Sequence, residues 1–468
     1  MTLPRARLVA LFIAGLLLAQ PAAAALDPQL RAARFEQAMG QTGAAIARLQ
    51  VERRQAGGAS SDELNAMLAE LYLTQGLYRR AGEQLRQLAK ADDGAWLRLA
   101  QLLARAGDIE GALQALARIT DELPPARQRE RLLLEGELLL RRGRLSAAEQ
   151  RLGLLLETGR RSDEAAYGRF DLAVARHRGG DTEAARELLD ALGRDSADSS
   201  QRRALRDKAN LTLGFDRLQA GEVDEAADYF KRARLNGPLS STALLGLGRA
   251  YASEEAYKKA LVPWLRLSKR DPADPAVQDA LLAVPYALGK LNAYKQALQY
   301  YNQAVGSFQL ETERLAKIEQ AVKDGSLVQS LVQAFGDEPG VVGRDRLRLL
   351  PATAGASHLW QLFSTNRFQA DLWNSAQIAR SLEKIQRWTS EVANDDSLPP
   401  ARRTALLARA TDLETRLQQL SHQFQQHMQD LALEELSRRR ERIKAYAEEA
   451  RFSIAQIYDY AAKRWGER

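Results

Sequence analysis

Residues 207–238 have the sequence DKANLTLGFDRLQAGEVDEAADYFKRARLNGP, which predicts two short helices joined by a turn. Apolar residues recur at helical spacing on both sides of Gly221, and this glycine ends the first helix. The small residues Gly214 and Ala226 lie where two antiparallel helices approach closely, and Phe230 is large enough to fill the space beside them. One such pair cannot bury its own apolar face, so the pattern must be repeated along the chain.

The pattern does recur. A turn glycine precedes a small residue by five positions in Gly76/Ala81, Gly107/Ala112, Gly143/Ala148, Gly180/Ala185 and Gly221/Ala226. Two further units, with Ala260 and Ala297 at the small position, have Glu255 and Asn292 in place of the glycine. An equivalent large residue follows in each second helix, namely Leu85, Leu116, Leu152, Leu189, Phe230, Trp264 and Tyr301. This pattern resembles the tetratricopeptide repeat, a helix–turn–helix unit of about 34 residues.

The composition supports an all-α fold class, because Leu, Ala, Arg, Glu and Gln dominate and no alternating strand pattern is present. The resemblance implies an αα-superhelix, a solenoid of about seven units over residues 62–305. Residues 26–61 are expected to form an N-terminal capping helix with Phe35 and Met39 facing inward. A helical extension and a Gly/Pro-containing linker are expected over residues 306–357.

Residues 358–468 are predicted to form a C-terminal region of long helices. Apolar residues and one histidine follow the spacing of a coiled-coil seam at Leu406, Ala410, Leu413, Leu417, Leu420, Phe424, His427 and Leu431. The seam is interrupted at residues 438–440 and resumes at Ile443. A helical hairpin that packs back on the helix beginning at His358 would satisfy this pattern, and so would self-association through a coiled coil between copies. The aromatic residues of the His358 helix favour the hairpin.

Residues 1–25 have the pattern of a secretory signal peptide, in which Arg5 and Arg7 precede an apolar stretch and small residues follow. The apolar stretch is shorter than the roughly 20 residues of a membrane span. We therefore expect cleavage and a periplasmic protein without stable membrane insertion; an uncleaved signal that anchors the chain to the inner membrane is the alternative. The chain has no cysteine, which suits an oxidising compartment and excludes thiolate catalysis and thiolate metal sites.

The sequence has no phosphate loop, dinucleotide fingerprint, nucleophile elbow or zinc-protease helix. Surface positions are expected for the four histidines, His177, His358, His422 and His427. The net charge is +7, but basic and acidic residues are interleaved along the helices, and the basic cluster at residues 438–444 is diluted by acids. We therefore expect a protein that is not an enzyme, has no cofactor or metal, and does not bind nucleic acid.

The resemblance implies that a partner binds the concave surface lined by the first helices. The family's groove positions, carried over to this sequence, give an apolar and aromatic centre flanked by basic residues: Arg141, Tyr167, Phe170, Val174, Arg178, Lys208, Leu211 and Phe215. The asparagines with which the family grips a terminal carboxylate are missing from the equivalent positions.

The predicted function is a scaffold that mediates protein–protein interactions in a cell-envelope assembly or transport system. Its partner would be another envelope protein, or a peptide with an apolar core and acidic character. Ordinary packing between repeats is the alternative explanation for these residues. The alternative function is a solenoid that binds polysaccharide or peptidoglycan, for which Trp96 and Tyr167 are the candidate aromatic platforms.

Overall fold

The computed structural model describes residues 28–39, 41–55, 62–75, 77–88, 93–105, 107–120, 123–159, 162–196, 198–336, 356–363 and 365–466. In these residues every regular element is an α-helix and no strand is present, which confirms the all-α fold class. The predicted signal peptide and most of the predicted linker lie outside the described residues. The chain divides into two compact units, Met1–Glu135 and Gly136–Arg468.

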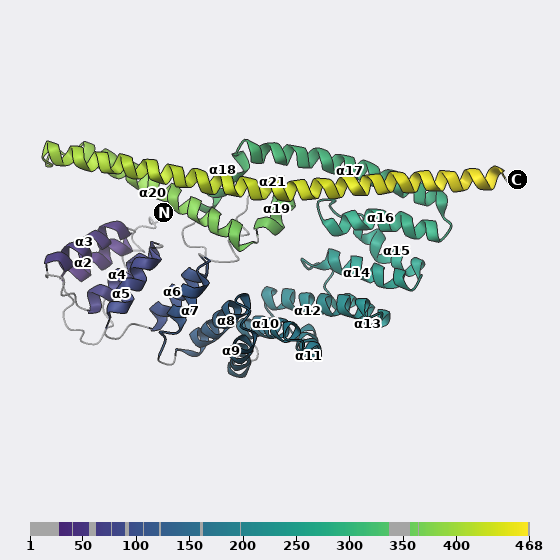
Figure 1. Cartoon of the computed structure of the whole chain (residues 1–468), viewed down its shortest axis with the longest axis horizontal. Helices are drawn as coiled ribbons and strands as arrows, with labels where there is room; N and C mark the ends of the chain where they lie inside the picture. Colours follow the sequence, from purple (N-terminus) through teal and green to yellow (C-terminus); the bar gives the residue numbers. More distant parts are fainter. Residues whose placement is uncertain are drawn as a thin grey trace, which may run out of the picture. The chain divides into compact units, whose positions relative to one another are not determined.

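The first unit consists of short helices that follow one another in pairs (Figure 1). Their bounds are α2 Pro28–Ala38, α3 Thr42–Gln55, α4 Asp62–Thr74, α5 Tyr78–Gln87, α6 Asp93–Arg105, α7 Ile109–Leu116 and the first part of α8, Pro125–Arg141. Where one capping helix was expected, α2 and α3 pack on each other through Leu30, Ala33 and Leu49. Phe35 and Met39 do not face inward as predicted, because Phe35 is 68% exposed and Met39 is also exposed.

The second unit continues the pairing and ends in longer helices (Figure 1). Their bounds are α9 Leu145–Thr158, α10 Asp163–Arg178, α11 Thr182–Gly193, α12 Ser200–Gln219, α13 Val223–Arg232, α14 Ser240–Ser253, α15 Tyr257–Leu267, α16 Pro275–Lys290, α17 Tyr294–Lys323, α18 Ser326–Gly336, α19 Ala356–Phe363, α20 Asn366–Ala393 and α21 Pro400–Gly466. From α4/α5 to α16/α17 the described chain contains seven consecutive helix pairs. Helix α17 runs on to Lys323, so the last repeat and the predicted helical extension share one helix.

In the pairs from α6/α7 to α16/α17, the turn contains a residue with left-handed backbone geometry. The φ angle is +85° at Gly107, +70° at Gly143, +93° at Gly180 and +81° at Gly221. Glu255 and Asn292, which the sequence aligns with these glycines, have φ angles of 58° and 59° and are the non-glycine residues with positive φ in the described chain. A left-handed conformation costs a side-chain-bearing residue roughly 1–2 kcal/mol. The turn is kept where glycine is lost, which confirms the alignment of the repeats.

Packing between successive pairs depends on a large side chain that lies against glycines. The Phe230 ring of α13 is buried, and a Cβ on Gly214 of α12 would lie 2.7 Å from its Cε1 atom. A Cβ on Gly246 of α14 would lie 2.5 Å from the same atom. The ring therefore fills space that exists because two neighbouring helices carry glycine. The sequence predicted this role for Gly214, and Gly246 adds the contact with the next repeat.

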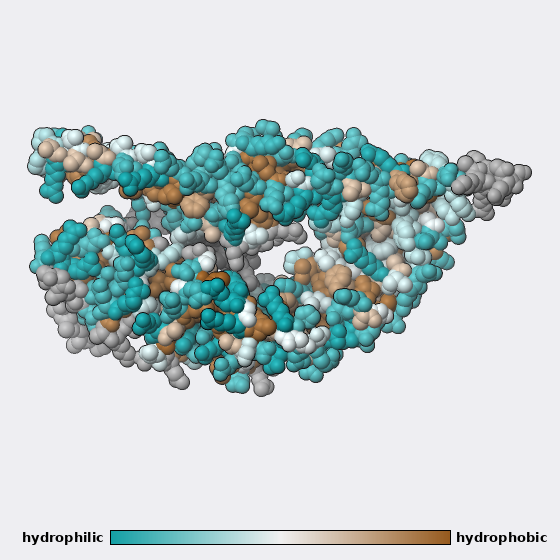
Figure 2. Space-filling view, viewed as in Figure 1, coloured by the Kyte–Doolittle hydropathy of each residue, from teal (hydrophilic) through white to brown (hydrophobic). Residues whose placement is uncertain are grey.

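The C-terminal helix α21 has 67 residues and packs on other helices of its own chain. It lies along α20 and then along α17, and its visible face is mainly hydrophilic with smaller hydrophobic patches (Figures 1 and 2). One apolar cluster joins five helices and includes Phe308 of α17, Leu331 of α18, Phe363 of α19, Phe368 of α20 and Met428 of α21. The sequence left open a helical hairpin within the chain and a coiled coil between copies. The structure has the hairpin.

Helix α21 continues through residues 438–440, where the seam was predicted to be interrupted, and the buried Arg439 there donates to Glu435 Oε1 at 3.0 Å and to the Ala273 carbonyl oxygen at 3.2 Å. Two other details of the predicted C-terminal region are wrong. The predicted seam is not wholly covered, since Leu413 and Leu420 are 46% and 44% exposed. The helix that begins near His358 is also divided, because Thr365 caps a new helix by accepting from the Phe368 amide.

The prediction that all four histidines lie on the surface is also wrong. His358 of α19 is buried and hydrogen-bonded to the buried Glu311 of α17. His427 of α21 is half-buried, and its Nδ1 lies 2.6 Å from Asp371 Oδ2 of α20. The first pair connects α19 to α17 and the second connects α21 to α20, so both histidines contribute to contacts between helices that are distant in sequence.

Candidate functional site

The predicted groove residues lie on α8, α10 and α12, the first helices of three successive repeats in the second unit. Arg141, Arg178 and Lys208 are exposed. Four apolar or aromatic residues are half-buried, namely Tyr167, Phe170, Val174 and Phe215. Leu211 is only 6% exposed and packs in the core cluster of α12, α13 and α14. The candidate surface therefore consists of the other seven residues.

The aromatic side chains of this surface each contact the core on one side. Tyr167 and Phe170 pack against the apolar cluster that joins α10, α11 and α12. The Phe215 ring meets Phe230 edge to face, with 4.9 Å between ring centroids and 72° between ring planes. Part of each side chain thus serves packing between repeats, and part is open to a partner.

A basic side chain lies over one of these rings. Lys208 Nζ of α12 is 4.3 Å from the centroid of the Phe170 ring of α10. An ammonium group over a ring face is attracted by the ring's quadrupole, by about 0.5–1 kcal/mol at an exposed site. The contact holds Lys208 beside the aromatic residues, where it can meet an acidic group of a partner.

Asp171 of α10 is a member of this site that the sequence analysis missed. Burial, followed by the nearby charge of Glu137, raises the pKa of Asp171 to about 7, although Lys208 and Arg141 act in the opposite direction. Near neutral pH this carboxyl group therefore exchanges a proton easily, and the local charge changes with it. The sequence could have indicated that Asp171 belongs to the site. It lies four residues after Tyr167 and three before Val174, which places all three residues on one helix face.

The chain's own C-terminal helix packs on the last repeat, mainly on α17 and also on its first helix α16. Arg249 Nη2 of α14 lies 2.7 Å from Asp279 Oδ2 of α16, and Tyr446 of α21 donates a hydrogen bond to the other carboxylate oxygen. Burial and the Asp279 carboxylate raise the pKa of Tyr446 to about 12, so its hydroxyl remains a donor over the physiological range. Helices α10 and α12, by contrast, pack on helices of the repeats next to them.

Three further observations concern sugar binding, membrane insertion and metal binding. Trp96, one of the two candidate platforms for a sugar ring, is 6% exposed, so its faces are not available for stacking. Over the described ranges, no helix combines the length and the apolar character that a membrane span requires. The same residues contain no group of three or more His, Asp or Glu side chains arranged to hold a metal ion.

Comparison with known families identifies the repeat. The sequence profile described as tetratricopeptide repeat matches residues 66–127 and 211–275. The chain contains tetratricopeptide repeats. The second match includes the turn at Gly221 and the Phe230 contact, so the family's pattern coincides with the packing described above. A comparison with curated proteins finds no match.

Solved structures with a similar arrangement include MamA, at 16% identity over 40% of this chain and 96% of that chain, with a TM-score of 0.32. The C-terminal part of a TPR repeat-containing protein from Cytophaga hutchinsonii matches at 16% identity over 54% and 99%, with a TM-score of 0.39. A tetratricopeptide repeat protein from Parabacteroides merdae matches at 16% over 55% and 97%, with a TM-score of 0.32.

Proposed function

We propose that this chain is a non-enzymatic periplasmic scaffold that holds another envelope protein in an assembly or transport system. Tetratricopeptide repeats serve protein–protein interaction, and the described helices present first-helix surfaces suited to it. The pattern of residues 1–25 and the absence of cysteine support export to the periplasm.

The observation that carries the proposal is the surface formed by α10 and α12. Half-buried Phe170 and Phe215 lie on successive first helices, the exposed Lys208 ammonium lies over the Phe170 ring, and the exposed Arg178 follows Phe170 by eight residues on α10. Binding energy at protein interfaces concentrates in a few aromatic and arginine residues. A partner that suits this surface would place apolar side chains on the rings and acidic groups beside the cations.

Site-specific photocrosslinking tests this proposal. A photoreactive phenylalanine analogue at position 170 should yield one dominant crosslinked partner in cells, identified by mass spectrometry. The same analogue at the exposed position of Glu187 on α11, a second helix, is the matched control and should not trap that partner. Equal trapping at both positions, or none at position 170, would count against α10 and α12 as the binding surface.

The proposed location has its own test. N-terminal sequencing of the protein purified from the envelope should find a mature chain that begins near Ala24 or Ala25, because small residues follow the apolar stretch there. Recovery of the uncleaved chain from the membrane fraction would replace the periplasmic proposal with an inner-membrane anchor.

A further inference from the structure

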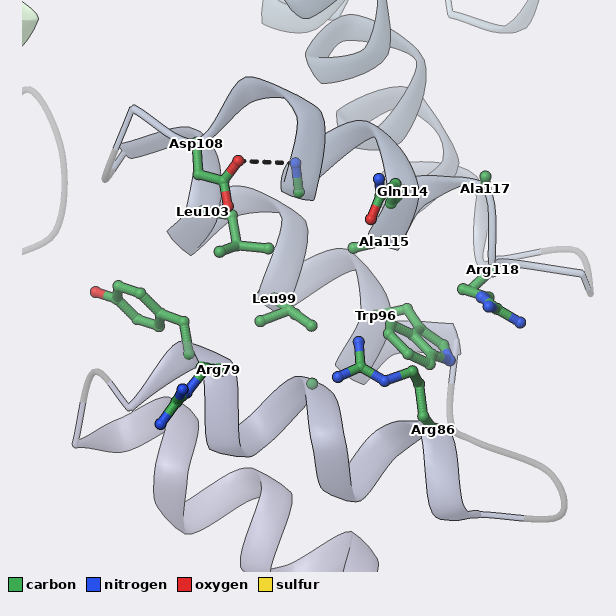
Figure 3. A pocket seen from close by; sticks show the side chains of 13 residues that line it. Arg79, Arg86, Trp96, Leu99, Leu103, Asp108, Gln114, Ala115, Ala117 and Arg118 are labelled. Carbon is green, nitrogen blue, oxygen red and sulfur yellow. Dashed lines mark hydrogen bonds between the residues drawn. The ribbon is translucent and has the colours of Figure 1, made fainter.

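The pocket of about 590 Å³ that α5, α6 and α7 form in the first unit does not gather charge around its apolar residues (Figure 3). Leu99 and Leu103 of α6 line it, but the guanidinium groups of Arg79 and Arg118 point away from them. The end of the C-terminal hairpin is different, because exposed apolar and basic side chains follow one another there in a fixed register.

The hairpin of α20 and α21 extends beyond the apolar cluster of its unit. This cluster, which includes Phe308, reaches Ala379 on α20 and begins at Met428 on α21. Beyond it, α20 and α21 continue side by side (Figure 1), and we name residues 381–393 and 400–420 the outer hairpin. A pair of helices buries only the rows of side chains that face each other, so apolar residues beside those rows stay accessible.

On α21, an apolar row beside the buried row is open. Ala410 belongs to the buried row and is 4% exposed. Leu413, three residues further on, is exposed, and the exposed Leu420 repeats its position seven residues later. Leu406 begins the same row and is half-buried. These leucines extend over about 21 Å of helix, because each residue of an α-helix rises about 1.5 Å.

Trp388 of α20 lies on the same face of the hairpin as these leucines. Val392 belongs to the buried row of α20, and Trp388 precedes it by four residues, as Leu413 precedes the half-buried Leu417 by four. A two-fold axis perpendicular to the plane of the hairpin relates two antiparallel helices, so side chains at equal offsets from the buried rows leave by one face. Trp388 is 40% exposed. With Leu406, Leu413 and Leu420 it forms a surface that we name the leucine face.

Basic side chains border the leucine face on α21. A row with the same seven-residue spacing lies next to the leucines, and its members are exposed, namely Arg402, Arg409 and Arg416. Arg416 pairs with Asp412 at 2.9 Å between Nη2 and Oδ2. Among the residues that the structure describes, none makes a hydrogen bond or an ion pair with the side chains of Arg402 and Arg409.

The positive charge is specific to this face of the hairpin. On α20, the cations Lys384 and Arg387 are exposed next to Trp388, and Glu391 offsets one of them. The exposed row on the opposite side of the α21 seam is uncharged, and consists of Thr404, Thr411 and Gln418. A ligand with negative charge beside apolar groups would therefore be complementary to the leucine face and not to the opposite face.

We propose that the leucine face binds an amphipathic helix of a partner protein, with its apolar stripe on the leucines and acidic residues beside the arginine row. Coiled coils are built in this way, since apolar rows form the contact and charges in the flanking rows select the partner. A second copy of the chain would bring an equally basic border against this one, and like charges at such positions repel. A lipid surface fits less well, because Leu413 and Leu420 are each more than half covered and cannot protrude into hydrocarbon.

Fluorescence anisotropy with the full chain and two labelled helical peptides tests this proposal. Each peptide has about three heptads with Ile and Leu at the contact positions, and the flanking rows carry Glu in the first peptide and Lys in the second. The parent should bind the Glu peptide at least about tenfold more tightly than the Lys peptide. The double variant Arg409→Glu and Arg416→Glu should reverse this preference, because the border of the leucine face then has the opposite charge.

Two further double variants complete the test. Leu413→Gln with Leu420→Gln removes the apolar contact and should weaken binding of the Glu peptide at least about tenfold. Lys444→Glu with Arg451→Glu is the matched control, since it changes the charge of exposed α21 residues by the same amount outside the outer hairpin. It should change the Kd less than about twofold. Unchanged melting curves would show that the variants fold as the parent does.

Four results would overturn the proposal. The first is a parent chain that does not bind the Glu peptide, or that binds both peptides equally. The second is an equal loss in the control variant, which would indicate unspecific attraction to a basic protein. The third is a dimer of the parent in sedimentation velocity that Leu413→Gln with Leu420→Gln dissociates, because a second copy would then cover this face. The fourth is binding to phosphatidylglycerol vesicles, but to neither peptide, that depends on the same leucines.

This surface is distinct from the surface of α10 and α12. Phe170→Ala should leave binding of the Glu peptide unchanged, and Arg409→Glu with Arg416→Glu should leave the crosslink at position 170 unchanged. Failure of one proposal can therefore be distinguished from failure of the other.

Discussion

Replacement of Asp171 by asparagine should stabilise the protein above neutral pH and have little effect in acid. Asparagine has the shape of the protonated carboxyl group and cannot ionise. The pKa of Asp171 is raised from its ordinary value of 3.8 to about 7 by burial and by Glu137. The folded state therefore binds a proton that the unfolded state has lost between these two pH values. Stability of the parent falls as pH rises through this window, and the full loss is present above pH 7.

The size of the effect follows from the shift. A pKa shift of about three units, at about 1.4 kcal/mol for each unit, gives an upper limit of roughly 4 kcal/mol for the gain in stability. Asp171 is only half-buried, so solvent screens part of this cost and we expect about 1–2 kcal/mol at pH 8. At pH 5 the difference in the free energy of unfolding between Asp171→Asn and the parent should be about a third of the difference at pH 8. Most of the pH range between the unfolded and folded pKa values of Asp171 lies above pH 5.

Urea unfolding at pH 5 and pH 8, followed by circular dichroism, measures this difference. Hydrogen exchange of the α10 amides should locate it, because repeat stability is shared mainly between neighbours. Glu187→Gln on α11 is the matched control; the residue is exposed, so its substitution should change stability by less than about 0.5 kcal/mol at either pH. If Asp171→Asn were no more stable than the parent at pH 8, the charged carboxylate would be well compensated by Lys208 and Arg141, and the argument from burial would be refuted.

Three further substitutions test the packing. Ala226→Leu should overpack a fully buried position between two helices and lower the free energy of unfolding by roughly 1–3 kcal/mol, measured as a lower urea midpoint; an unchanged midpoint would contradict the repeat alignment. Phe215→Ala removes a half-buried ring and its contact with the core, so we expect a loss of about 2 kcal/mol, less than the roughly 3–5 kcal/mol of a fully buried phenylalanine. Arg439→Ala should reduce hydrogen-exchange protection of α21 by about 1–3 kcal/mol, whereas the exposed Arg438→Ala should change it by less than about 0.5 kcal/mol.

The repeats could be predicted because their determinants are local. A turn residue with positive φ, a small residue five positions later and a large residue after it lie within one unit, and Glu255 and Asn292 could be aligned even without glycine. The contacts of the C-terminal region are not local. His358 and Glu311 are 47 residues apart, and no spacing in the sequence connects them. Arg439 belongs to a basic cluster of the kind that is usually solvated, but it is buried and donates to a carbonyl oxygen 166 residues away.

The sequence predicts which helix face carries the candidate surface, but it does not predict how deeply each residue of that face is buried. Leu211 and Phe215 are four residues apart on α12, so helical spacing gives them one orientation. Their different burial depends on α13 and α14, which cover Leu211 and meet only one side of Phe215. Asp171 shares the face of Tyr167, yet its raised pKa follows from burial and from charges on two other helices.

The docking of α21 on α16 restricts where a partner can bind in the second unit. Tyr446 donates to Asp279 of α16, and Asp279 also binds Arg249 of α14, so the C-terminal helix contacts α16 directly and is linked to α14 through the Asp279 carboxylate. A partner that used this face of the late repeats would have to displace these contacts. It would also have to displace the hydrogen bond from Arg439 of α21 to the Ala273 carbonyl oxygen. No such displacement is needed at α10 and α12, where the half-buried rings and the Lys208 ammonium are already partly exposed. Occupation of the late repeats by the chain itself thus favours the earlier repeats as the surface for an external partner.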